Sequence, residues 1–86
     1  MHYLIVYKSV TFVNRMKKMI NDKYPVSVVQ LPGNLGIKGC HYALRCNAND
    51  LDSLIGLSER NKIAIQAVFS ESDDKGAARY VKYDIS

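Results

Sequence analysis

The sequence predicts an α+β domain with the ferredoxin-like order β-α-β-β-α-β, extended by one C-terminal edge strand. Two segments repeat apolar residues at helical spacing, and five short segments are rich in β-branched or aromatic residues. Their order along the chain is that of a split β-α-β unit. At 86 residues, with 48% apolar and 23% charged residues, the chain is expected to form one domain over 1–86, and its composition excludes a disordered tail and a fibrous repeat.

The first half of the chain begins with a strand and a helix. Residues 2–7 are apolar, aromatic and β-branched, which predicts a buried strand. Ser9 is suited to cap a helix from about Val10 to Lys23, because its side chain can accept a hydrogen bond from the first turn. Pro25 ends that helix, and the β-branched run from Val26 to Leu31 predicts the second strand.

The middle of the chain contains the most irregular stretch. Pro32 opens a segment with three glycines, which predicts a conformationally demanding loop up to residue 39. A third strand from Cys40 to Cys46 is expected to follow. Asn47 or Asn49 can cap a second helix, which should end near Asn61.

The last third is expected to contain two strands. Ile63 to Phe69 predicts the fourth strand, Ser70 to Gly76 a polar loop, and Ala78 to Ile85 a half-buried edge strand. In that last strand one set of side chains alternates with another: Val81, Tyr83 and Ile85 against Tyr80, Lys82 and Asp84.

Two helices can cover only one face of this sheet, so the other face is expected to be open. Tyr3, Ile5 and Tyr7 of the first strand, with Ala43 and Arg45 of the third, are expected to line it. Apolar area of that size is seldom left to water. We therefore expect a contact surface there, and a homodimer, because symmetric pairing is the commonest way to cover such a face.

Charge and length limit the function classes. The net charge is +4 and the pI is about 9.2, a balance too modest to demand nucleic acid. No apolar run approaches the roughly 20 residues of a membrane helix, and no basic start precedes the short N-terminal apolar run. We expect a cytoplasmic protein with no membrane partner and no cofactor, a carrier, binding or regulatory module rather than an enzyme.

The two cysteines are expected to be free thiols with different environments. On one strand they would be roughly 20 Å apart, beyond the reach of a disulfide. Cys46 shares an inward register with Leu44, whereas Cys40 follows the glycine-rich loop and has Lys38 nearby to stabilise a thiolate. Cys40 is therefore expected to be the more exposed and reactive thiol. His41 could act as its base only if Cys40 still lies in the loop, because strand neighbours point to opposite faces.

The glycine-rich loop does not predict a nucleotide site. Its glycines lead into a strand, whereas phosphate loops use the N-terminus of a following helix. Two interpretations remain open: a passive connection, or a loop that presents Cys40 with the support of Gly36, Lys38, Gly39 and His41.

The segment from Lys38 to Arg45 also resembles the longer RNP motif of RNA-recognition domains. It matches at Lys38, Gly39 and Tyr42 and lacks the aromatic residues expected at positions 40 and 45. The opposite register, with Tyr42, Leu44 and Cys46 inward and His41, Ala43 and Arg45 outward, avoids burying an arginine. Nucleic acid is therefore not expected as a partner.

The order of these segments resembles a bacterial family of small selenium/sulfur carrier-like domains over roughly residues 1–70. The most specific features are Pro32 after the second strand, then Cys40, then the Ala43-Leu44-Arg45 strand. The chain departs from the family pattern in Gly33, in Gly36 to Gly39 before the cysteine and in His41 after it, and its loop is one residue longer.

The resemblance implies that Cys40 carries sulfur or selenium as a persulfide or selenide, supplied by a cysteine desulfurase or another sulfur- or selenium-transfer protein. The alternative is a non-catalytic binding or regulatory module that uses the open sheet face for a small ligand, RNA or a protein subunit.

Overall fold

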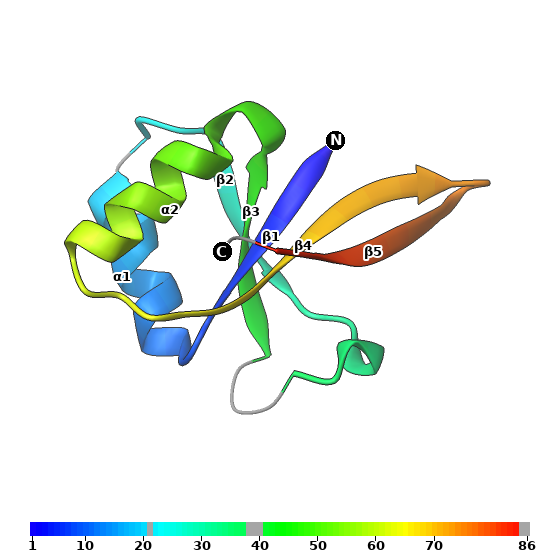
Figure 1. Cartoon of the computed structure of the whole chain (residues 1–86), viewed down its shortest axis with the longest axis horizontal. Coiled ribbons are helices and arrows are strands. Elements are labelled where there is room, and N and C mark those ends of the chain that lie inside the picture. Colours follow the sequence, from blue (N-terminus) through cyan, green and yellow to red (C-terminus); the bar gives the residue numbers. More distant parts are fainter. Residues whose placement is uncertain (21, 38–40, 85–86) are drawn as a thin grey trace.

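The structure is a computed structural model that describes residues 1–20, 22–37 and 41–84. It contains one antiparallel sheet of five strands with two helices packed on one face (Figure 1). The elements are, in chain order, β1 (His2–Tyr7), α1 (Val10–Ile20), β2 (Val26–Gln30), the 3-10 turn η1 (Gly33–Leu35), β3 (Tyr42–Asn47), the 3-10 turn η2 (Ala48–Asp50), α2 (Leu51–Arg60), β4 (Ile65–Asp74) and β5 (Ala77–Tyr83).

The strand order is β2-β3-β1-β4-β5, and each neighbouring pair is antiparallel. β3 lies between β1 and β2, and β1 lies between β3 and β4, so both helical crossovers span one intervening strand. β5 adds a fifth strand outside β4. The α+β class and the C-terminal edge strand are therefore confirmed.

The first helix begins as the sequence predicts and ends earlier. Ser9 Oγ accepts a hydrogen bond from Phe12 N at 3.4 Å, the contact of an N-cap. The helix stops at Ile20, three residues before the expected Lys23, and Lys23 N donates to Ile20 O in the following turn. The prediction of an asparagine cap on α2 is wrong, because the turn η2 precedes that helix and Asn47 makes no side-chain cap hydrogen bond.

The predicted polar loop from Ser70 to Gly76 is wrong. β4 continues to Asp74 and pairs with β5 in register, and the connection is the two-residue turn Lys75-Gly76. Both turn residues have positive φ, 53° and 83°, which suits the twist of a tight hairpin. Polar residues form the strand here because pairing with β5 satisfies their backbone groups.

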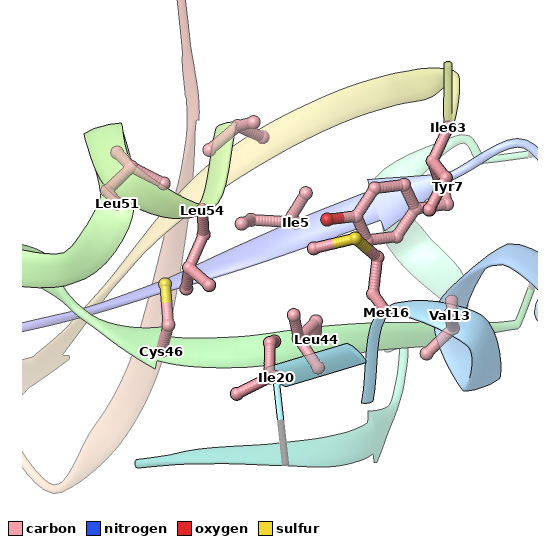
Figure 2. Packing of buried hydrophobic residues seen from close by; sticks show 11 residues of the cluster. Ile5, Tyr7, Val13, Met16, Ile20, Leu44, Cys46, Leu51, Leu54 and Ile63 are labelled. Carbon is pink, nitrogen blue, oxygen red and sulfur yellow. The ribbon is translucent and has the colours of Figure 1, made fainter. Parts of the chain in front are cut away.

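The main core lies between the sheet and the helices (Figure 2). Ile5 of β1 and Leu44 of β3 meet Met16 of α1 and Leu54 of α2, and all four side chains are fully buried. The Tyr7 hydroxyl also lies in this core and pairs with Ser58 Oγ at 2.7 Å, while Ser58 Oγ donates to Leu54 O at 2.9 Å. The polar atoms of this buried pair are thereby satisfied.

The opposite sheet face carries a second, smaller core cluster, made by the buried residues Leu4, Val6, Ala43, Ala67 and Phe69. Leu31, Leu35 and Ile37, from the segment after β2, pack against this cluster, and so does Tyr80 of β5. Part of the face expected to be open is therefore covered by the chain itself.

The expected lining of the open face is wrong for β1. Ile5 and Tyr7 are fully buried and Tyr3 packs against the same cluster, all on the helix side. The pairing of Ile5 with Leu44 explains this, because directly opposed residues on antiparallel strands share a face. β1 turns Leu4 and Val6 to the other side.

The edge strand β5 also differs from expectation. Val81 and Tyr83 were expected on its half-buried side, but they are 50% and 38% exposed. Tyr80, on the other side, is the residue of β5 that packs against a core cluster. The helices stop short of β5, so they do not cover Val81 and Tyr83. Tyr83 instead contacts Tyr3 of β1 edge to face, with the two ring centroids 5.1 Å apart.

Candidate functional site

The two residues flanking the segment of Cys40 are both held by the fold. Cys40, Lys38 and Gly39 lie outside the described residues. Ile37, before them, packs against the second core cluster, and His41, after them, accepts a hydrogen bond at its carbonyl oxygen from Leu31 N at 2.7 Å. The His41 side chain is exposed. Gly36 has φ 72°, a left-handed conformation that explains one glycine of the loop.

This loop leaves the sheet at the end where α1 begins. Ile5 pairs with Leu44 in antiparallel register, so the last residues of β1 lie beside the first residues of β3. Figure 1 shows the start of α1 and the start of β3 at the same end of the sheet. Exposed His41, half-exposed Tyr42 and exposed Lys8 therefore share one end of the molecule.

Cys46 is a core residue, as its register predicts. Its side chain is 1% exposed and belongs to the buried cluster drawn in Figure 2, which also contains Leu54 and Ile20. Burial raises the pKa of this thiol to about 11, with a further contribution from the Asp50 carboxylate. A neutral, enclosed thiol is a poor nucleophile, so Cys46 is unsuited to accept sulfur.

The register of β3 is confirmed at Leu44 and Cys46, which face the helices, and at Arg45, which faces away. The exposures expected at the start of the strand are wrong. Tyr42 is 42% exposed, because β3 extends past the helices there. Ala43 faces away from the helices as expected, but it is buried against the second cluster.

Arg45 belongs to a polar network that the sequence did not reveal. Its Nε donates to Glu71 Oε1 at 2.6 Å and its Nη2 lies 3.2 Å from His2 Nδ1. Tyr80 donates to the other oxygen, Glu71 Oε2, at 3.0 Å. These side chains join β1, β3, β4 and β5. His2, Arg45 and Glu71 also border a hollow of about 430 Å³. Glu71 lies in the segment expected to be a loop, so no strand partner was expected for it. In the structure it pairs with His2 of β1, the strand between β3 and β4.

Replacing Glu71 with Gln is expected to lower the free energy of unfolding at pH 7 by about 1 kcal/mol, since a partly exposed, charge-assisted hydrogen bond is lost. Burial raises the pKa of Glu71, but hydrogen bonds from Arg45 and Tyr80 outweigh it and the net pKa is lowered. The carboxylate therefore stabilises the fold above its unfolded pKa of about 4.3, and this contribution is lost as the pH falls through the native pKa.

Urea unfolding of wild type and Glu71→Gln from pH 7 to pH 3 measures this contribution. The difference in free energy of unfolding between the two proteins should shrink below about pH 4. Asp74→Asn is the matched control, because its contact with Arg79 is longer, 3.9 Å, and more exposed. An equal loss in both variants, or a loss that does not change with pH, would contradict the assignment.

No group of three or more His, Cys, Asp or Glu side chains is placed to hold a metal ion within residues 1–20, 22–37 and 41–84. In the same part of the chain, neither helix has the length and apolar character needed to cross a membrane.

Comparison with known proteins gives one family. The chain matches no curated protein and no solved structure significantly. Residues 2–70 match the profile of the family described as "putative Se/S carrier protein-like". The match spans β1 through most of β4 and includes Pro32, Cys40 and the Ala43-Leu44-Arg45 strand, as the resemblance implied. The chain belongs to this Se/S carrier-like family.

Proposed function

We propose that the protein is a cytoplasmic sulfur or selenium carrier, itself not an enzyme, that holds the transferred atom on Cys40. Membership of the Se/S carrier-like family supports this class of function. The observation that carries the choice of residue is the environment of Cys46, 1% exposed with a pKa raised to about 11. Of the chain's two cysteines, this leaves Cys40 as the acceptor.

The transfer is a thiol–disulfide-type exchange. The Cys40 thiolate attacks the outer sulfur of a persulfide on the donor, a new S–S bond forms on Cys40, and the donor's S–S bond breaks to release its thiolate. The selenium reaction is the same exchange with selenium as the outer atom. A cysteine desulfurase, or another sulfur- or selenium-transfer protein, would supply this donor. Lys38, two residues before Cys40, and the loop glycines favour the thiolate.

Incubation with a cysteine desulfurase and cysteine should add one sulfur atom to the wild-type protein. Cys40→Ala should abolish the addition, and Cys46→Ala should retain it. Intact-mass spectrometry of the three proteins measures the number of added sulfur atoms. Absence of any added sulfur, or loading that survives Cys40→Ala, contradicts the proposal.

The second candidate is a non-catalytic binding or regulatory module, and it would gain if no sulfur is loaded. The exposed Val81 and Tyr83 beside Tyr3 favour a protein subunit as its partner, because they form an apolar patch next to the free edge of β5. In this second candidate function, the protein subunit that binds the patch is a second copy of the chain, which makes a homodimer.

We also propose that the domain is a ferredoxin-like one extended by β5. Two split β-α-β units support this assignment. In the first, α1 connects β1 to β2 across β3, and in the second, α2 connects β3 to β4 across β1.

A further inference from the structure

The outer face of α1 is basic: the helix contains three Lys and Arg and no acidic residue, and Asp22, just beyond its end, is the one carboxylate among the described residues beside this face. Val13, Met16 and Ile20 form the buried side of the helix. Arg15 and Lys18 are exposed on the opposite side, three residues apart and therefore on the same face.

The cations of α1 lack carboxylate partners in the described part of the chain. The ion pairs found there are Arg45–Glu71 and Arg79–Asp74, and neither involves α1. Lys17 donates to the carbonyl oxygen of Val26 at 3.1 Å. Arg15 and Lys18 are both exposed, and their charges face solvent. Asp22 is the only acidic residue among the first 49 positions, which hold seven Lys and Arg.

This face is slightly hollowed, with a volume of about 760 Å³. Guanidinium and ammonium groups with amide and hydroxyl side chains beside them suit carboxylates, because each cation can donate several hydrogen bonds. The hollow is lined by Thr11, Asn14, Arg15, Lys17, Lys18 and Asp22.

The position of α1 relates this face to the proposed acceptor. α1 starts at the end of the sheet where β3 starts, and His41, which precedes β3, is the residue after Cys40 in the chain. Exposed Lys8, just before α1, adds a cation at that end. A protein lying along α1 would therefore reach the end of the sheet at which the Cys40 loop joins β3.

We infer that the exposed face of α1 docks an acidic surface of the protein that delivers sulfur to this carrier. The inference rests on the proposed function and adds the partner's chemistry to it. Nucleic acid fits this face less well, because α1 exposes no aromatic ring on which a base could stack: Phe12 packs against the core. The tyrosines of β1 lie on the helix side of the sheet, where Tyr7 is fully buried.

The test compares two sulfur donors and two charge-reversed proteins. R15E/K18E reverses the α1 face, and K75E/K82E makes the same change in net charge at exposed positions of the β4–β5 hairpin. With a persulfide-loaded cysteine desulfurase at low salt, R15E/K18E should load sulfur about 10-fold more slowly than wild type, because complementary charges raise association rates. K75E/K82E should load sulfur at a rate close to that of wild type. Added salt should reduce the difference in loading rate between R15E/K18E and wild type.

Cysteine persulfide, a small donor that needs no docking surface, should load all three proteins at the same rate. Equal slowing of both charge-reversed proteins with the desulfurase, or no slowing of R15E/K18E, would overturn the docking inference while leaving the carrier function intact. Failure of wild type to accept sulfur from either donor would overturn the carrier function, and the inference with it. If wild type binds a fluorescent single-stranded oligonucleotide more tightly than R15E/K18E does at physiological salt, the partner of this face is nucleic acid and the inference of an acidic protein is wrong.

Discussion

In the Cys40→Ala variant, the remaining thiol should react with iodoacetamide at pH 8 at least about 100-fold more slowly in the native protein than in guanidinium. Two effects combine. Burial raises the pKa of Cys46 to about 11, so little thiolate is present at pH 8. Its side chain is 1% exposed, so the reagent reaches it only through transient opening of the fold.

Cys46→Ala is the matched control, because it leaves only the thiol of Cys40. That variant should react in the native state at a rate comparable with its unfolded rate or faster. Rapid alkylation of native Cys40→Ala would show that Cys46 is accessible and would remove the reason for excluding it as the acceptor.

Replacing Ile5 with Ala should lower the free energy of unfolding by about 2–5 kcal/mol, because the side chain is fully buried and its loss leaves a cavity. For a domain of this size the melting temperature should fall by at least about 10 °C. Ile5→Val provides a milder test if the alanine variant fails to fold, with an expected loss of about 0.5–1.5 kcal/mol. Thermal and urea unfolding followed by circular dichroism measure both.

Val81→Ala serves as the control, since Val81 is 50% exposed on the edge strand, and it should change stability by less than about 0.5 kcal/mol. A large loss for Ile5→Ala beside a small one for Val81→Ala is expected if Ile5 is buried in the core. Two small losses are expected if Ile5 lies on an open sheet face, as predicted from the sequence. Similar small effects for Ile5→Ala and Val81→Ala would contradict the packing described for β1.

The order of the elements could be predicted from the sequence because it depends on local patterns. The apolar run of β1, the helical spacing after Ser9 and the proline before β2 each predict one element without reference to the others. The β4–β5 hairpin was harder to predict. Its residues 70–74 are polar, and they form a strand through pairing with β5, with Glu71 held by Arg45 and Tyr80.

The face of each β1 residue could not be predicted from β1 alone. β1 is a central strand, with the helices on one side and the second core cluster on the other. Its residues from Leu4 to Tyr7 are all buried, so hydrophobicity shows no alternation. The pairing of Ile5 with Leu44 sets the face, and this requires knowing the register of two strands that lie far apart in the chain.

The cysteines show the same division between local and long-range information. The inward register of Cys46 follows from its even spacing with Leu44 on one strand, and the structure confirms it. The reactivity expected of Cys40 depends on the loop between Ile37 and His41, and it remains a prediction for chemical labelling.

Peptide mapping of the sulfur-loaded wild-type protein tests the central claim most directly, because trypsin separates the two cysteines. Cleavage after Lys38 and Arg45 places Cys40 in the peptide 39–45, and cleavage after Arg60 places Cys46 in the peptide 46–60. After loading by a cysteine desulfurase and alkylation, the peptide 39–45 should carry one additional sulfur atom and the peptide 46–60 none. Additional sulfur on the peptide 46–60, or on neither peptide, would contradict the assignment of Cys40 as the carrier residue.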